Sequence, residues 1–110
     1  MNAYLIDIEN EESRAEYVFQ KDGNSFSITL DTITANEKED DSSYLTIASI
    51  SVNGEELCNS LRCRPNKLII PFDYKSKYGN FLFNCINDEV PYYEKFGLTQ
   101  FLYYIPAEEL

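Results

Sequence analysis

The feature that most constrains this chain is a strictly alternating segment that follows a tight-turn signal. In residues 25–30, Phe26, Ile28 and Leu30 alternate with small hydroxyl residues. A period of two places successive side chains on opposite faces of a strand, one face in a core and the other in water. The preceding Asp22 and Gly23 supply the positive backbone angles of a two-residue hairpin turn. Residues 15–20 and 25–30 are therefore predicted to form a β-hairpin.

The same kinds of signal recur along the rest of the chain. Asn53 and Gly54 form a second hairpin signal after the β-type segment 44–52, and further strands are predicted at 4–8, 67–71, 81–86 and 101–105. Residues 57–64 carry both helical and strand spacing, and the polar segment 34–43 is either a mobile loop or a short helical turn. Short strands between frequent turns predict an all-β fold, an antiparallel β-sandwich or small barrel with little helix. At 110 residues the chain suits one domain, residues 1–110.

The charge of the chain is acidic and unevenly distributed. The net charge is −10, and residues 1–50 hold eleven acidic and three basic residues, a balance of −8. Residues 62–77 reverse this with a balance of +4, because only Asp73 opposes Arg62, Arg64, Lys67, Lys75 and Lys77. A negative field repels phosphates, so the composition argues against a nucleic-acid partner. The basic segment is either a solvated surface or a contact for an acidic partner, which includes the acidic half of another copy.

The cysteines indicate free thiols in a reducing compartment. There are three, Cys58, Cys63 and Cys85, and the chain has no histidine. The first residues lack the basic start and apolar run of a secretion signal, and no segment is long and apolar enough to span a bilayer. We therefore expect reduced thiols packed as small hydrophobic groups, with no bound metal and no membrane contact.

Catalytic patterns are not found in the sequence. Without histidine there is no His-based triad, and four scattered glycines form no phosphate-binding loop. The carboxylate pairs, such as Asp40 with Asp41, lie in predicted turns, where acidic residues usually face water. The run around Asp40 also lacks the spacing of a calcium-binding loop. We expect no enzyme activity and no cofactor. The tyrosines and phenylalanines near the C-terminus are interpreted as core and contact residues, since their acidic surroundings do not suit base stacking.

The last quarter of the chain carries the most specific pattern. A turn runs from Asp88 to Pro91, Phe96 and Gly97 follow, and a tyrosine-rich strand ends the chain. This layout resembles the closing segment of the small baseplate plug family of contractile-tailed phages and prophages. The resemblance extends over approximately residues 19–110. Its earlier elements, in order, are Phe26-x-Ile28-x-Leu30, the strand that opens at Tyr44, the Asn53-Gly54 turn with Leu57 beyond it, Gly79 and Phe81.

This resemblance implies a structural protein of the virion tail baseplate, made in the host bacterial cytoplasm. Its expected partners are hub, tube and spike proteins, together with possible further copies of itself. In the closing segment, Pro91, Phe96 and Gly97 are expected to shape a structural loop, with Tyr92 and Tyr93 facing outward beside it. The interface candidates are Tyr92, Tyr93, Arg62, Arg64, Lys67, Lys75 and Lys77.

A second class of function stays open at the level of sequence. A small acidic cytoplasmic protein can inhibit a toxin or nuclease, because acidic surfaces bind basic active sites quickly and tightly. The net charge of −10 suits that hypothesis. The basic segment 62–77 argues against it, since a mimic of nucleic-acid charge has no use for a positive patch.

Overall fold

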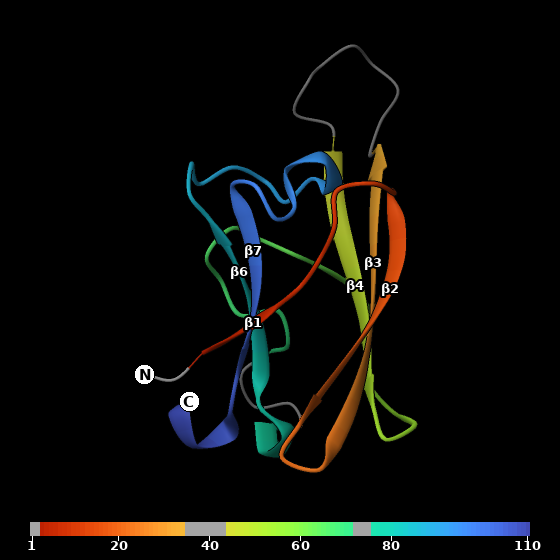
Figure 1. Cartoon of the computed structure of the whole chain (residues 1–110), viewed down its shortest axis with the longest axis vertical. Helices are drawn as coiled ribbons and strands as arrows, with labels where there is room; N and C mark the ends of the chain where they lie inside the picture. The colour runs from red at the N-terminus through yellow and green to blue at the C-terminus, as the bar shows by residue number, and fades with distance from the viewer. Residues whose placement is uncertain (1–2, 35–43, 72–75) are drawn as a thin grey trace.

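The structure, a computed structural model, describes residues 3–34, 44–71 and 76–110, and these form two antiparallel β-sheets packed face to face (Figure 1). The three-stranded sheet has the order β1-β7-β6, and the four-stranded sheet has the order β2-β3-β4-β5. The sheets do not close into a barrel, so the all-β prediction is confirmed in its sandwich form. The strands are β1 (Tyr4–Ile6), β2 (Arg14–Lys21), β3 (Asn24–Thr34), β4 (Tyr44–Val52), β5 (Glu55–Arg62), β6 (Asn80–Cys85) and β7 (Gln100–Ile105).

Both predicted hairpins are present in the four-stranded sheet. Lys21 pairs with Asn24 across Asp22 and Gly23, whose φ angles are 56° and 81°. Val52 pairs with Glu55 across a second two-residue turn, in which both φ angles are again positive. Two successive positive φ angles match the right-handed twist of the flanking strands, which is why Asp-Gly and Asn-Gly favour this turn.

The hydrophobic core lies between the two sheets, which are seen edge-on in Figure 1. The inward positions of β3, Phe26, Ile28 and Leu30, are at most 1% exposed, as the alternating pattern predicts. Phe81 of β6 faces them from the other sheet, with its ring edge-on to Phe26 at 5.5 Å between ring centroids. Full burial of a side chain of this size stabilises the fold by about 1.5–3 kcal/mol. This aromatic contact therefore joins the two layers at their centre.

Two segments differ from simple strands. Residues 57–64, which the sequence left ambiguous, continue β5 through a bulge at which Ser60 has a φ of 57°. A second register shift, opposite Ile50 and Ser51, leaves Leu57 as an extra residue and lets the neighbours Leu57 and Cys58 both be buried. The predicted strand 67–71 is wrong, since only a single bridge joins Leu68 to Leu82. The side chain of Asn80 bonds both the N–H and the C=O of Ile70, so an amide side chain replaces the regular ladder there.

Helical structure in the described residues is limited to short 3₁₀ turns, η2 (Ser76–Tyr78), η3 (Tyr93–Lys95) and η4 (Ala107–Glu109). This agrees with the prediction of little helix. The segment 34–43, predicted to be a loop or helical turn, lies outside the described residues apart from the last residue of β3. Among the residues that the structure covers, no helix has the length and apolarity needed to cross a membrane.

Candidate functional site

The closing loop, residues 88–98, covers one end of the sandwich between β6 and β7 (Figure 1). Phe96 fixes it in the core, where its side chain is 3% exposed. Its ring stacks on that of Phe83 of β6, with 5.2 Å between centroids and 28° between planes. The loop is therefore packed as part of the core and not laid over it.

Two buried threonines bond the backbone of the loop to the four-stranded sheet. The hydroxyl of Thr46 on β4 donates to the carbonyl oxygen of Pro91 at 2.7 Å, and it lies 2.7 Å from the hydroxyl of Thr32 on β3. Because each hydroxyl has one proton, Thr32 must donate to Thr46. The N–H of Tyr93 then donates to Thr32 at 3.1 Å. The series begins and ends on the closing loop, and it satisfies every polar atom that it includes.

Gln100, at the start of β7, holds the loop from the other sheet. Its side chain is fully buried; the amide nitrogen donates to the carbonyl oxygen of Val90 and the amide oxygen accepts from the N–H of Tyr92. Both atoms of the amide group are thus used on adjacent parts of the loop. A buried amide costs free energy unless it is bonded, so this pairing fixes the loop as well as the glutamine.

Pro91 and Gly97 occupy special backbone positions of the loop. Pro91 is buried, and its carbonyl is the group that Thr46 binds. Gly97 has a φ of 79°, and a Cβ atom built there would lie 3.2 Å from the carbonyl oxygen of Ile8. Its N–H donates to the carbonyl oxygen of Gln100 at 2.8 Å. Glycine suits this position because residues with a Cβ atom rarely adopt this φ, and because little space separates the Cα of residue 97 from the backbone of Ile8.

Tyr92 and Tyr93 are half-buried, so neither faces fully outward as the sequence suggested. The ring of Tyr92 lies 4.5 Å from that of Tyr44 on β4 and 5.3 Å from that of Tyr93, measured between centroids. Burial, and then the charge of Glu94, raise the pKa of Tyr92 to about 12. The phenol of Tyr92 is therefore neutral at ordinary pH. Tyr44, Tyr92 and Tyr93 form an amphipathic cluster at this end of the molecule.

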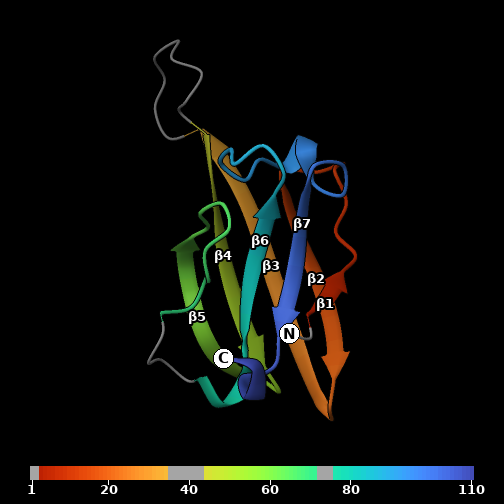
Figure 2. The same cartoon turned by 90° about the vertical axis from the view of Figure 1, so that its left-hand side faces the viewer.

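The predicted basic segment is spread along the β5 side of the sandwich and not gathered in one patch. Arg62 ends β5, and Arg64 and Lys67 follow it in the next loop. Lys77 lies in η2, near the opposite end of the molecule (Figure 2). All four side chains are exposed. Lys75 lies outside the described residues.

The acidic N-terminal half forms a depression beside the open edge of β2. Its volume is about 330 Å³, and it is formed by Glu9, Glu11 and Glu12 of the loop before β2 and by residues 14–17 of β2 itself. The phenol of Tyr17 bonds the backbone of Glu9, which holds the loop against the strand. Arg14 forms an ion pair with Asp31 at 3.1 Å, so part of its positive charge is neutralised by its own sheet.

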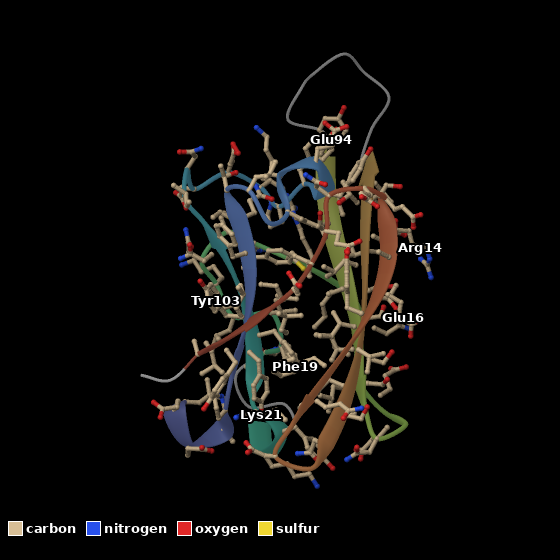
Figure 3. All side chains as sticks on the ribbon, viewed as in Figure 1. Arg14, Glu16, Phe19, Lys21, Glu94 and Tyr103 are labelled. Carbon is tan, nitrogen blue, oxygen red and sulfur yellow. The ribbon has the colours of Figure 1, made fainter. Side chains whose placement is uncertain are left out.

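The outer face of the three-stranded sheet carries an apolar row that the sequence reading did not identify. Leu5, Tyr103 and Leu82 pair across β1, β7 and β6, and Leu68 bridges to Leu82 at the far edge. Leu5 is 56% exposed and Leu68 is 39% exposed, while Tyr103 and Leu82 are half-buried. Figure 3 shows Tyr103 on the side of β7 that faces away from the other sheet. A continuous row of this kind is typical of a contact surface.

The three thiols are free and buried in the structure. Burial raises the pKa of Cys58 and of Cys85 to about 11, and it raises the pKa of Cys63 further. In the described ranges no cluster of three or more cysteine and acidic residues could hold a metal ion. We expect these thiols to react slowly with thiol reagents in the native protein, because the thiolate is the reactive form.

Sequence reasoning missed the residues that hold the closing loop, Thr32, Thr46 and Gln100. A signal for two of them was present. Thr32 occupies the next core-facing position of β3 after Leu30, and Thr46 occupies the core-facing position of β4 that precedes Ala48 and Ile50. A polar residue in the inward phase of a strand requires a buried partner. The partner itself, a carbonyl on a loop 45 residues away, has no local sequence signal.

The described residues thus form a β-sandwich with a hydrogen-bonded end loop and an exposed apolar row on one sheet. The family described as cyanophage baseplate Pam3 plug gp18 matches this sequence over residues 3–108. The chain belongs to that baseplate plug family, and it is a structural component of the phage tail baseplate. The resemblance drawn from the closing segment is thus confirmed, and it favours this function over the acidic inhibitor. A comparison with curated proteins gave no match.

Proposed function

We propose that this chain acts as a non-catalytic plug, a single domain that joins hub, tube and spike proteins of the baseplate by surface contact after synthesis in the host bacterial cytoplasm. Membership of the baseplate plug family supports this proposal. The chemistry of the described surface supports it as well. The tyrosine cluster of the closing loop and the apolar row of the three-stranded sheet are contact surfaces, and aromatic residues are enriched in such surfaces.

The observation that carries the proposal is the apolar row Leu5–Tyr103–Leu82–Leu68. Its members come from three strands and one loop segment, yet the strand register aligns them on one face. When a partner covers such a row, each Å² of apolar surface removed from water contributes about 25 cal/mol of favourable free energy. The row therefore favours association with a complementary apolar surface. We infer that another baseplate protein covers this face in the assembled tail.

A matched pair of substitutions tests this assignment. Leu68 and Ile33 are 39% and 40% exposed, and they lie on the outer sides of different sheets. Leu68→Asp introduces a charge into the proposed contact, whereas Ile33→Asp makes the same change on the four-stranded sheet. Each variant replaces the wild-type chain in the phage or prophage that encodes it, and the amount of the chain in purified tails is measured.

We expect Leu68→Asp to lower incorporation by roughly tenfold or more, because burying an unpaired charge is costly. Ile33→Asp should be incorporated like the wild type. Equal incorporation of both variants would contradict the assignment of the row as the contact. Absence of the wild-type chain from purified tails would contradict the proposed function itself.

A further inference from the structure

The four-stranded sheet has two open edges, β2 on one side and β5 on the other. Lys21 and Asn24 flank a two-residue turn and therefore form a hydrogen-bonded pair. Alternation along the ladder then leaves the N–H and C=O groups of Arg14, Glu16, Val18 and Gln20 directed away from β3. Among the described residues, the backbone bonds of β2 go only to β3. An open edge of this kind is a template for pairing with another chain.

The edge of β2 lacks the usual protection against such pairing. It contains no proline, and its register with β3 is regular over its whole length. Its charged side chains are held by partners within the same chain: Arg14 by Asp31, Glu16 by Ser27, and Lys21 by the ring of Tyr4 at 4.1 Å. Figure 3 shows Arg14 and Glu16 on the outer side of the sheet. Val18, between Glu16 and Lys21 in the strand, is 66% exposed.

Charges of opposite sign lie at the two edges, at the same level of the sheet. The register pairs Arg14 with Asp31, Asp31 with Ile47 and Ile47 with Arg62, so the start of β2 and the end of β5 share one row. Glu11 and Glu12 are exposed beside the start of β2, and Arg62 and Arg64 are exposed at the end of β5. Within the part of the chain that the structure describes, these two arginine side chains have no hydrogen-bond or ion-pair partner.

The number of strands makes the two edges compatible. In a four-stranded antiparallel sheet the edge strands β2 and β5 run in opposite directions. A second copy in the same orientation beside the first would therefore place its β2 antiparallel to β5. The shared row would place Arg14 of that copy, which is paired with its own Asp31, opposite Arg62. Glu11 and Glu12, which precede Arg14, would then lie next to Arg64, which follows Arg62. The bulge at Ser60 interrupts the other half of β5, so the contact is centred on Arg62.

We propose that copies of this chain associate edge to edge, with the arginine end of β5 in one copy against the acidic start of β2 in the next. This rests on the proposed function as an assembly protein and names one partner, a second copy. The two surfaces in contact are different, so the association is head-to-tail, and it forms a ring when the rotation between copies closes. Exposed ion pairs are screened by salt, so the association should weaken as ionic strength rises.

The test uses the purified full chain and two charge reversals of complementary edges. Arg64→Glu alters only the β5 edge, and Glu11→Lys with Glu12→Lys alters only the β2 edge. Lys95→Glu is the control, since it changes the net charge as much as the arginine reversal but at an exposed position in the closing loop, away from both edges. Sedimentation equilibrium at low and high salt measures the association constant of each variant and of an equimolar mixture of the two edge variants.

We expect the wild type to associate at low salt, and each edge variant to associate roughly tenfold to a hundredfold more weakly. The mixture should recover association, because each variant retains the edge that complements the altered edge of the other. The control should behave like the wild type. A monomeric wild type at every salt concentration, or a control as weak as the arginine variant, would overturn the edge contact. Normal incorporation of the arginine variant into tails would then leave the proposed function intact.

Discussion

The closing loop and the open edges of the four-stranded sheet are both rich in polar groups, but the structure treats these groups in opposite ways. In the loop, the carbonyl groups of Val90 and Pro91 and the N–H groups of Tyr92 and Tyr93 are bonded by buried side chains. At the edges, backbone groups of β2 face outward and Arg62 and Arg64 are exposed. The loop is therefore specified from within the chain, whereas the edges are available to other molecules.

The difference shows how to separate stability from association in this molecule. A substitution that removes a bonded group from the loop leaves a buried polar atom without a partner, which lowers the free energy of unfolding. A charge substitution at an exposed edge residue changes the electrostatic potential at the surface where another molecule would bind, and it has little effect on the free energy of unfolding. The predictions below test this division, beginning with the largest expected effect.

Phe96→Ala is expected to have the largest effect on stability. The side chain is 3% exposed and stacks on Phe83, so truncation leaves a cavity where the loop enters the core. We expect a loss of about 3–5 kcal/mol in the free energy of unfolding. Urea denaturation followed by circular dichroism measures it. A loss below roughly 1 kcal/mol would show that the loop is not specified by the core, and the comparison would fail.

Thr46→Val tests the hydrogen bonds that hold the loop. Valine has nearly the shape of threonine, but it cannot donate to the carbonyl oxygen of Pro91 or accept from Thr32. We expect a loss of about 1–3 kcal/mol from the groups left without partners. Ser49→Ala, at an outward-facing position of the same strand, is the control and should lower the free energy of unfolding by less. Equal losses would mean that the buried hydroxyl contributes no more than the half-buried hydroxyl of Ser49, which bonds Asn59 and Ser60 on the outer face.

Gly97→Val tests the backbone of the loop against a glycine of the same conformation. Gly97 and Gly23 have φ angles of 79° and 81°, but only Gly97 has a neighbour within 4 Å of an added Cβ, the carbonyl oxygen of Ile8. We expect Gly97→Val to lower the free energy of unfolding by on the order of 1–3 kcal/mol and Gly23→Val to lower it by less. A valine at either position is strained by the positive φ, but only the valine at 97 would also crowd the carbonyl oxygen of Ile8. If Gly23→Val is the more destabilising variant, the close approach to Ile8 does not matter.

The elements that were predictable from sequence are those whose signals are local. Period-two alternation gave the strand 25–30, and the Asp-Gly and Asn-Gly turns gave both hairpins, because turn geometry depends on two adjacent residues. The segment 67–71 was predicted wrongly for a nonlocal reason. Its residues have the composition of a strand, but the side chain of Asn80 takes the bonds of Ile70 that a neighbouring strand would take.

The contact surfaces were less accessible to sequence reasoning because they depend on register. Leu5, Leu68, Leu82 and Tyr103 are unremarkable individually, and only strand pairing aligns them in one row. The opposite charges of 1–50 and 62–77 were visible, but their position at the same level of two sheet edges was not. The sequence also predicts the basic segment as one unit, whereas Arg62 ends β5 and Lys77 lies in η2, beside the start of that strand.

The smallest expected effect on stability is that of Tyr92→Ala, which lies where the two kinds of region meet. Its backbone N–H is bonded to Gln100 as in the rest of the loop, but its ring is half-buried and packs on Tyr44 and Tyr93 at the surface of the molecule. An aromatic pair of this kind contributes about 0.5–1.5 kcal/mol beyond its buried area, so the loss should be well below that of Phe96→Ala. Incorporation into tail baseplates should decrease more than stability does, because the cluster of three tyrosines offers an aromatic surface to a partner.

Urea denaturation and tail incorporation are measured on Tyr92→Ala, Tyr93→Ala and Tyr44→Ala, with Tyr92→Phe as the variant that keeps the ring. If Tyr92→Phe is incorporated normally and Tyr92→Ala is not, the ring is the contact. If instead Tyr92→Ala unfolds as readily as Phe96→Ala, the tyrosine cluster belongs to the core. Tyr92 and Tyr93 would then be withdrawn as interface residues, and the boundary between the two regions would move to the sheet edges.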